Sequence, residues 1–548
     1  MKKIYRLLYS NKFVAMVMLL MQIITFVAMY IWISDYSKVL FGLSTVLSAV
    51  LIIFEINRTE ESTFKMTWIT LIAIIPIFGA LFYLFTRAQG VSMNIGDDYK
   101  NIQEANKKYL VQDEDVMKNI YQTDKNQDGF ARYLSKYGGS PAYTNTGVQY
   151  YSIGERMFED MKKELLKAEK FIFLEFFIIN HTSRMWNEIL EILKKKVKQG
   201  VEVRVMYDGM GCIVTLPRKY NEYLERHGIK CRIFSPIVPL LSTHQNNRDH
   251  RKIMVIDGAT AFCGGINISD EYINEKMKFG YWKDAGIRLT GDCVWNFTSM
   301  FLEMWDYITK SEDDYAFYRN ASIPQLGNAT RNQWIATEGN TEVEGENPAA
   351  TKRMAQRRVE EPHLTGAGFV QPYCDSPLDH EDVGENVYLN LIEHAKRYVY
   401  IFTPYLIIGS EMATALINAA KCGVDVRIVV PGVPDKKLVY LLTQGNFAHL
   451  IKGGVKIYKY TPGFIHSKCF VVDDVYAAVG TINLDYRSLY LHFECGTFMY
   501  RTKAVMQVKE DALATIDQSL LVTLAECQSK KLIVRMFMGA LKLFAPLL

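Results

Sequence analysis

The sequence predicts an α/β protein built from an internally duplicated unit and preceded by an apolar helical region. From about residue 146 onward, helical patterns alternate with short runs of apolar, β-branched residues, which is typical of α/β domains. Segments of this pattern recur in the same order later in the chain, which indicates a duplication. The N-terminal region holds an outsized share of the apolar residues, which indicates a membrane region.

The N-terminal region, residues 1–86, contains three apolar runs. Phe13–Ile33 is an uncharged run long enough, at about 1.5 Å per residue, to cross roughly 30 Å of hydrocarbon. Val39–Phe54 is shorter, and Met66–Phe85 is again of full length and contains Pro76, which membrane helices tolerate. A cleaved signal peptide is the alternative for the first run, but no small-residue cleavage site follows it. We therefore predict two to three membrane helices and a multi-pass protein of the cell membrane.

Basic residues flank this region on both sides, at Lys2 and Lys3 before it and at Lys107 and Lys108 after it. The positive-inside rule would hold both flanks in the cytoplasm, which three spans cannot satisfy. One apolar run is therefore interfacial or re-entrant, or the N-terminal bias is overridden. The nine cysteines form no CxxC pair and no close Cys/His ligand spacing, which argues against a disulfide framework and a zinc site. Reduced thiols favour a cytoplasmic main domain.

The charge balance limits the kind of partner. Lys and Arg number 63 against 59 Asp and Glu, so the formal net charge is +4. This value is too close to neutral to predict nucleic-acid binding by the overall field of the protein. Any anion that the protein handles must therefore meet a local cluster of basic groups.

The α/β region divides into two halves, which we expect at residues 146–327 and 366–548 after a polar connector at 87–145. Residues 328–365 separate the halves, lack apolar periodicity, and are predicted to be a disordered linker or insertion. The end of the second half, Lys530–Leu548, mixes Lys and Arg with large apolar residues and is expected to form an amphipathic helix. This helix could lie on anionic lipid or dock as an ordinary helix.

Matched segments reveal the duplication. The predicted strand Phe171–Phe177 corresponds to Tyr398–Phe402, and Gly200–Val205 corresponds to Gly423–Ile428. In each case a helix precedes a buried strand, and any α/β protein contains such segments. Several matches in one order make a duplication the better explanation.

Each half also carries the spacing His-x-Lys-x-x-x-x-Asp on a strand pattern. The residues are His250, Lys252 and Asp257 in the first half and His466, Lys468 and Asp473 in the second. Alternate residues of a strand face the same side, so each histidine is expected to project with its lysine toward one site. Glycines follow each strand and precede an asparagine, Asn267 or Asn483, which a tight turn would present nearby.

The remaining histidines have no repeated context, and we expect them to be structural. They are His181, His227, His244, His363, His380, His394, His449 and His492.

With these two motifs the chain resembles the phospholipase D superfamily, which is named for a duplicated HKD motif. The resemblance covers about residues 145–548 outside the linker. It implies two phospholipase D-like α/β/α sandwich halves that share one active site. It also implies that His250 attacks phosphorus to form a phosphohistidine, while His466 protonates the leaving alcohol and then deprotonates the incoming one. The lysines and asparagines of the motifs would stabilise the phosphoryl oxygens, and no metal or other cofactor is implied.

The same resemblance implies that each histidine is oriented by an acid from the other half. Glu494 would serve His250, and Asp284 would serve His466. The aspartates that complete the motifs, Asp257 and Asp473, are expected to be structural and to hold the loop after each strand.

Flanking segments are similar to bacterial cardiolipin synthases. They are Ile75–Ala80 with Tyr83, Asn247–Lys252, Gly264–Asn267 with Asp270–Tyr272, Asn483–Ser488 and Leu543–Leu548. The run Phe13–Ile33 and the insertion 328–365 depart from that family without touching the motifs. The implied reaction is a phosphatidyl transfer that makes cardiolipin and glycerol from two phosphatidylglycerol molecules. The implied partners are phosphatidylglycerol and anionic membrane lipid, not nucleic acid.

Other functions share the same motif residues. A phospholipase D-type hydrolase or another phosphatidyltransferase is the principal alternative, followed by a membrane-bound nuclease. A non-catalytic lipid-binding protein would be expected to lack a motif residue, whereas both triplets are complete here. The oligomeric state and the acyl-chain preference stay open.

Overall fold

Two units make up the chain in the computed structural model, which describes residues 24, 36–58, 61–90, 94–236, 246–322, 368–379 and 381–545. The α/β unit comprises residues 96–236 and 248–530, and the helical unit comprises residues 1–95, 237–247 and 531–548. The predicted first membrane run, Phe13–Ile33, lies outside the described residues except at Ile24. The predicted linker at 328–365 also lies outside them.

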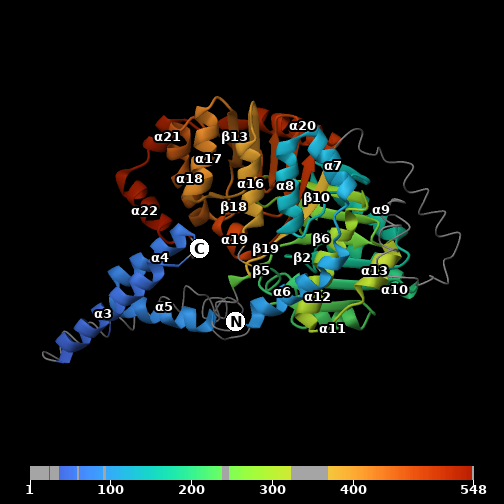
Figure 1. Cartoon of the computed structure of the whole chain (residues 1–548), viewed down its shortest axis with the longest axis horizontal. Helices are drawn as coiled ribbons and strands as arrows, with labels where there is room; N and C mark the ends of the chain where they lie inside the picture. Colours follow the sequence, from blue (N-terminus) through green and yellow to red (C-terminus); the bar gives the residue numbers. More distant parts are fainter. Residues whose placement is uncertain are drawn as a thin grey trace. The chain divides into compact units, whose positions relative to one another are not determined.

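The α/β unit contains two large sheets, parts of which are visible in Figure 1, and the strands of the two sheets follow the same order. The first sheet consists of β1 (Thr146–Tyr151), β9 (Gly286–Gly291), β7 (Thr260–Gly264), β6 (Lys252–Ile256), β2 (Phe171–Phe176), β3 (Glu202–Asp208) and β4 (Lys230–Phe234). The second consists of β10 (Phe369–Asp375), β19 (His492–Tyr500), β17 (Tyr476–Gly480), β16 (Cys469–Val472), β11 (Tyr398–Phe402), β13 (Asp425–Pro431), β14 (Lys456–Tyr460) and β20 (Ser519–Leu521). In each sheet a parallel trio, β2–β3–β4 or β11–β13–β14, joins antiparallel strands. This common order confirms the duplicated α/β architecture.

Helices cover both faces of each sheet, as the two-sided burial of the central strands requires. On one face of the first sheet lie α9 (Gly154–Lys167), α10 (Arg184–Lys198) and α11 (Tyr220–Glu225), and on the other lies α12 (Val294–Thr309). On one face of the second lie α16 (Val383–Glu393), α17 (Ser410–Lys421) and α18 (Lys437–Lys452), and on the other lies α20 (Lys503–Asp517). In β2, Phe171 and Phe173 point to one apolar cluster and Ile172 and Leu174 to another.

The two halves meet in a shared apolar core. Phe173 of the first sheet and Tyr400 of the second belong to the same cluster of buried side chains, together with α12 and α20. The remaining elements of the unit are shorter: η1 (Lys107–Tyr109), β5 (Arg248–Asp249), η3 (Asp270–Ile273), β8 (Tyr281–Lys283), α13 (Tyr315–Ser322), β12 (Leu406–Ile407), β15 (Gly463–Ile465), β18 (Leu484–Asp485), α19 (Tyr486–Tyr490) and α21 (Leu524–Gln528).

Most of the interval expected to be a polar connector folds into helices. These are α6 (Asn94–Asn106), α7 (Glu114–Thr123) and α8 (Lys125–Lys136). Met117 and Ile120 in α7 and Leu134 in α8 are buried against the second sheet. Tyr99 of α6 is fully buried, and its hydroxyl accepts a hydrogen bond from Arg251 at 3.3 Å. An amphipathic spacing of a few apolar residues is enough to dock these otherwise polar helices.

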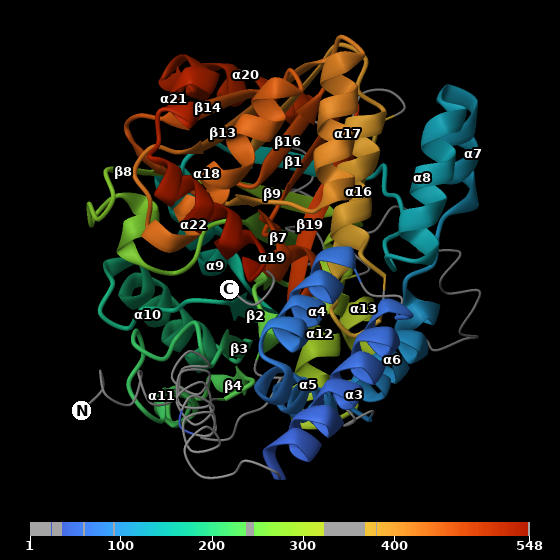
Figure 2. The same ribbon diagram turned by 90° about the vertical axis from the view of Figure 1, so that its left-hand side faces the viewer.

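The helical unit contains α3 (Tyr36–Ile56), α4 (Ser62–Ile74), α5 (Pro76–Gly90) and α22 (Leu532–Lys542) (Figure 2). The expectation that Met66–Phe85 forms one membrane helix is wrong, because α4 ends at Ile74 and α5 begins at Pro76. Proline has no backbone N–H and cannot continue a helix without a kink or break.

The chain turns back sharply at this proline. A Cβ atom at Gly79 would lie 2.5 Å from the carbonyl oxygen of Leu71, so only glycine allows α5 to pack this closely against α4. Among the helices that the structure describes, none is both long and apolar enough to cross a membrane.

Candidate active site

Two short strand pairings join the halves and place the histidines of both motifs. β5 pairs in parallel with the start of β19, and β15 pairs in parallel with β8. The N–H of His250 donates to the carbonyl of Phe493 at 2.9 Å, and the N–H of His466 donates to the carbonyl of Lys283 at 2.7 Å. Each histidine is therefore fixed by backbone hydrogen bonds to the other half.

Each imidazole contacts an acid from the opposite half, which is the crosswise pairing that the resemblance implies. His250 Nδ1 lies 2.8 Å from Glu494 Oε1, and His466 Nδ1 lies 2.7 Å from Asp284 Oδ2. Both acids are completely buried. Because Nδ1 of each ring is engaged by an acid, Nε2 is the nitrogen left for chemistry.

The histidines lie just before the motif strands, not within them as the sequence pattern suggested. β6 begins at Lys252 and β16 at Cys469, so both His250 and His466 precede the sheet ladder. The cross-half pairings replace the ladder at these positions. An alternation of apolar residues predicts where a strand lies in the sequence. A short pairing with a distant segment produces no such alternation, so the sequence could not show that the histidines lie outside the motif strands.

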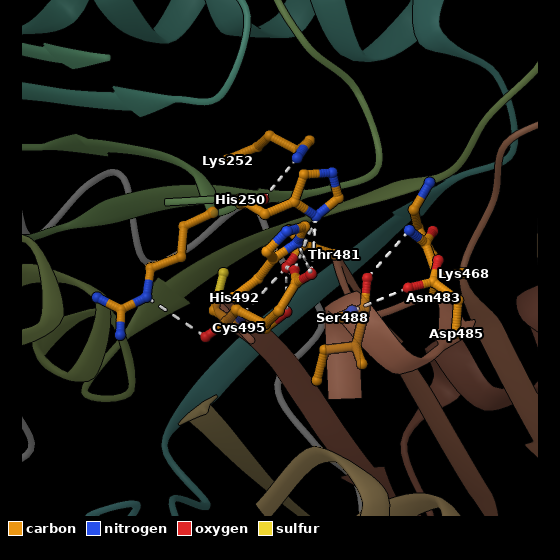
Figure 3. A network of polar contacts seen from close by, with 12 residues as sticks. His250, Lys252, Lys468, Thr481, Asn483, Asp485, Ser488, His492 and Cys495 are labelled. Atoms are coloured by element: carbon orange, nitrogen blue, oxygen red, sulfur yellow. Dashed lines mark hydrogen bonds and ion pairs between the residues drawn. The ribbon is translucent and has the colours of Figure 1, made fainter. Parts of the chain in front are cut away.

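Each lysine is held close to the histidine of its motif, and Figure 3 shows this for Lys252 and His250. Lys252 Nζ donates to the carbonyl of His250 at 2.5 Å, and Lys468 Nζ donates to the carbonyl of His466. Both lysines are buried, with 1% and 2% of their surface exposed. Two buried ammonium groups therefore accompany the two imidazoles, as anion binding requires.

The asparagines occupy matched positions, each tied to a residue five positions later. Asn267 Nδ2 donates to the Tyr272 hydroxyl at 2.8 Å, and Asn483 Nδ2 donates to Ser488 Oγ at 3.0 Å. Asn267 Oδ1 also accepts from the N–H of Ile178 at 2.9 Å. Both amides are buried, so their orientation is fixed by these contacts.

The aspartates of the two motifs make contacts with the backbone. Asp257 accepts hydrogen bonds from the N–H groups of Glu169, Lys170 and Phe171 at 2.7–2.9 Å. Asp473 accepts in the same way from the three N–H groups of residues 396–398. Both aspartates have a positive φ of 55°, a conformation that Asp tolerates better than most residues. These carboxylates hold the turn before β2 and β11.

Burial and the neighbouring lysines keep both catalytic-motif imidazoles uncharged. Burial, and next the charge of Lys252, lower the pKa of His250 well below its ordinary value. Burial and Lys468 lower the pKa of His466 to about 4. Burial also lowers the pKa of Lys468 to about 7 and, less strongly, that of Lys252.

The two acids differ in their electrostatics. Burial opposes ionisation of Asp284, but His466 and Lys468 outweigh it and lower the pKa of this carboxyl. Burial raises the pKa of Glu494 well above its ordinary value, although the charge of Lys252 opposes this. The two acids therefore give the two sides of the site unequal charge distributions.

A third histidine, His492, lies in the site, although its lack of a repeat had suggested a structural residue. Its ring centroid is 5.5 Å from that of His250 (Figure 3). A signal was present in the sequence: His492 and Glu494 are two positions apart, a spacing that places both side chains on one face of a strand such as β19.

Within the described residues, one group brings metal-ligand atoms together. Atoms of His250, His492 and Glu494 lie within 4.8 Å of one another. The neighbouring positive charges of Lys252, Arg248 and Arg487 disfavour a cation there. The charges around this group therefore favour an anion over a metal ion.

Comparisons with known proteins agree with this geometry. A family described as "Cardiolipin synthase, PLD-like domain" matches residues 161–284 and 388–514, and one described as "Phospholipase_D-nuclease N-terminal" matches residues 45–87. The two PLD-like matches contain Asp284, His466 and Glu494.

Relatives match over almost the whole chain. An uncharacterized protein of Streptococcus mutans is 45% identical over 91% of this chain and 99% of its own length. A cardiolipin synthase of Alkalihalophilus pseudofirmus is 30% identical over 95% of this chain and 97% of its own length. The crystal structure of a phosphatidylserine synthase from Haemophilus influenzae has the same fold, with a TM-score of 0.52 and 16% identity over 73% of this chain and 95% of that chain. The chain is a bacterial enzyme of the cardiolipin synthase family, within the phospholipase D superfamily.

Proposed function

We propose that this enzyme is a phosphatidyltransferase that converts two phosphatidylglycerol molecules into cardiolipin and glycerol. The observation that carries the proposal is the pair of buried imidazoles, His250 and His466, each oriented at Nδ1 by an acid of the other half. Two uncharged imidazoles beside two lysines suit a two-step displacement at a phosphodiester. The family membership supports the choice of lipid substrate.

In the first step, His250 Nε2 attacks the phosphorus of phosphatidylglycerol. A P–N bond forms as the P–O bond to the glycerol head group breaks, and the leaving oxygen takes a proton from His466 Nε2. His466 must therefore carry a proton when substrate is bound. The anionic phosphate favours this protonation, and ionised Asp284 stabilises the imidazolium. The products are glycerol and a phosphatidyl group on His250.

In the second step, the hydroxyl of another phosphatidylglycerol attacks the phosphohistidine. His466 Nε2 takes the proton of this hydroxyl, the new P–O bond forms, and the P–N bond to His250 breaks. Cardiolipin leaves and both imidazoles return to their starting states. Lys252 and Lys468, with Asn267 and Asn483, stabilise the negative charge on the phosphoryl oxygens in both steps.

The surroundings of His466 support transfer to an alcohol over hydrolysis. The rings of Trp282, Phe464 and Tyr272 lie 5.3, 5.8 and 5.6 Å from the ring of His466. Apolar side chains beside the proton acceptor disfavour water relative to a lipid alcohol. A phospholipase D-type hydrolase would need water at this same position.

The end of the chain supports work at an anionic membrane surface. In α22, Leu532 and Ile533 are 69% and 70% exposed, and Met536 and Phe537 are also exposed. No acidic residue follows Glu526, whereas basic residues remain frequent to the end of the chain. An exposed apolar face flanked by basic groups suits a helix that lies in the interface of anionic lipid.

Features of the helical unit and the free thiols support a location of the protein at the cell membrane. Leu543 accepts a hydrogen bond from the Thr67 hydroxyl at 2.6 Å, so the C-terminal segment packs against α4 within the helical unit. Apolar side chains of α3 such as Leu43 and Ile53 are more than half exposed. All nine cysteines are free. We infer a protein of the cell membrane, attached through its N-terminal apolar region, whose α/β unit faces the cytoplasm.

The purified full-length protein, incubated with phosphatidylglycerol vesicles and EDTA, tests the proposal by its products. We expect equimolar cardiolipin and glycerol. Phosphatidic acid in place of cardiolipin would identify a hydrolase, and cleavage of added nucleic acid would identify a nuclease. A requirement for one particular divalent ion would contradict the mechanism, because the two lysines are expected to supply the positive charge.

A further inference from the structure

The two halves correspond position by position around the histidines. Two positions before the motif histidine stands Arg248 in the first half and Phe464 in the second. Two positions before the acid stands Trp282 in the first half and His492 in the second. Arg248 pairs directly with His492, and Phe464 pairs directly with Trp282. Equivalent pairs therefore flank both histidines.

The two pairs differ in chemical character. Trp282 and Phe464 form an aromatic pair beside His466, with ring centroids 4.8 Å apart. Arg248 and His492 form a polar, basic pair beside His250. One side of the site is therefore apolar and the other is suited to an anion.

The imidazole of His492 packs against His250, but its Nδ1 makes no hydrogen bond within the part of the chain that the structure describes. It is 11% exposed, and its Nδ1 is buried with no hydrogen-bond partner among the described residues. This nitrogen lies 3.7 Å from Glu494 Oε1, beyond hydrogen-bond range. By contrast, the indole N–H of Trp282 donates to Asp284 Oδ2 at 3.4 Å. A buried polar group without a partner costs free energy, so its retention points to a ligand.

The surrounding charges define which ligand suits His492. Burial, and next the charges of Arg487, Lys252, Arg248 and Lys436, lower the pKa of His492 well below its ordinary value. The ring is therefore neutral at pH 7 and carries one N–H donor. These positive charges repel a metal ion and attract an anionic oxygen.

We propose that His492 is a further substrate-binding residue, whose N–H donates to a non-bridging oxygen of the phosphatidyl group carried by His250. Arg248, on the paired strand, adds positive charge beside the same oxygen. This inference rests on the proposed function and deepens it. The polar side of the site holds the phosphoryl group, and the aromatic side receives the alcohol.

Three variants of the full-length protein test this assignment. His492→Phe keeps a planar ring but removes both nitrogens, His492→Leu removes the ring, and His492→Asn keeps an N–H donor. We expect the Phe and Leu variants to lose about ten- to a hundredfold in kcat/KM for phosphatidylglycerol, the effect of losing one hydrogen bond to a charged group. His492→Asn should retain most activity. His449→Phe, at an exposed histidine of α18, is the matched control and should behave as wild type.

A second readout isolates the step. In a His466→Ala background, His492→Phe should further slow the accumulation of the phosphatidyl adduct, measured by intact mass at alkaline pH. The thermal midpoint of each variant checks its fold, and the Leu variant decides the result if the Phe variant is destabilised. Wild-type kcat/KM in both variants, while the wild type makes cardiolipin, would overturn the role of His492 alone. Failure of the wild type to make cardiolipin would overturn the proposed function instead.

Discussion

His466 Nδ1 lies 2.7 Å from Asp284 Oδ2, although 182 positions separate the two residues in the sequence. A backbone hydrogen bond joins the same two segments: the N–H of His466 donates to the carbonyl of Lys283, the residue before the acid. Both contacts join the second half to the first. Neither half alone can therefore supply an oriented acid–base pair.

Replacement of this acid should reduce catalysis more than folding. In Asp284→Asn, the amide cannot stabilise an imidazolium on His466, so kcat should fall by about a hundredfold or more. The measurement is the initial rate of cardiolipin formation. Asp160→Asn in α9, outside the site, is the control and should leave kcat unchanged. A wild-type kcat in Asp284→Asn would show that His466 needs no ionised partner.

The two histidines should behave differently when each is removed. His250→Ala cannot form a phosphohistidine, whereas His466→Ala keeps the nucleophile and loses the base that activates the incoming alcohol. After incubation with phosphatidylglycerol, intact mass at neutral or alkaline pH should show a phosphatidyl adduct only in His466→Ala. The opposite pattern would exchange the two roles. Full activity in either variant would exclude the two-histidine mechanism.

The dependence of kcat/KM on pH should reflect the ionisation of Lys468. Its pKa is lowered to about 7, so the free enzyme carries this charge below pH 7 and loses it as the pH rises through that value. Consequently kcat/KM should fall above pH 7, while kcat falls less because bound phosphate stabilises the ammonium group. Lys468→Arg, which stays protonated, should remove the decline. The hypothesis fails if the alkaline limb is the same in both proteins.

The motif aspartates should affect stability and not chemistry. Asp257→Ala removes the acceptor of three backbone N–H groups and places alanine at a φ of 55°, so the free energy of unfolding should fall by roughly 3 kcal/mol. Asp257→Asn keeps one acceptor and tolerates the backbone, so its loss should be smaller. Thermal unfolding measures both. Loss of kcat in folded, thermally stable Asp257→Asn would instead indicate a catalytic role.

The amphipathic helix should bind anionic lipid. Combining Ile533→Glu with Phe537→Glu places two charges on the exposed apolar face of α22 and should abolish its contribution to vesicle binding. Flotation with phosphatidylglycerol vesicles, compared with neutral phosphatidylcholine vesicles, measures the effect. Glu411→Gln in α17 is a control on the α/β unit. Unchanged flotation of the double variant would favour the alternative of an ordinary docking helix.

The two motifs and the duplicated fold could be read from the amino-acid sequence alone. The two His-x-Lys spacings and the helix–Gly–strand matches each involve residues that are close together in the sequence. Such patterns can be recognised without knowing which distant segments meet. The strand predicted at Tyr398–Phe402 matches β11. All five of its residues are buried, and successive side chains pack into the apolar clusters on opposite faces of the sheet.

Two features depend on contacts between segments that are distant in the sequence, and these were visible only in the tertiary structure. His492 enters the site only because β5 of the first half pairs with β19 of the second, a contact that no local period encodes. The run Met66–Phe85 reads as one apolar segment, but Pro76 and the close approach at Gly79 fold it into two helices. Hydrophobic patterning states which residues avoid water, whereas packing between segments decides which residues meet.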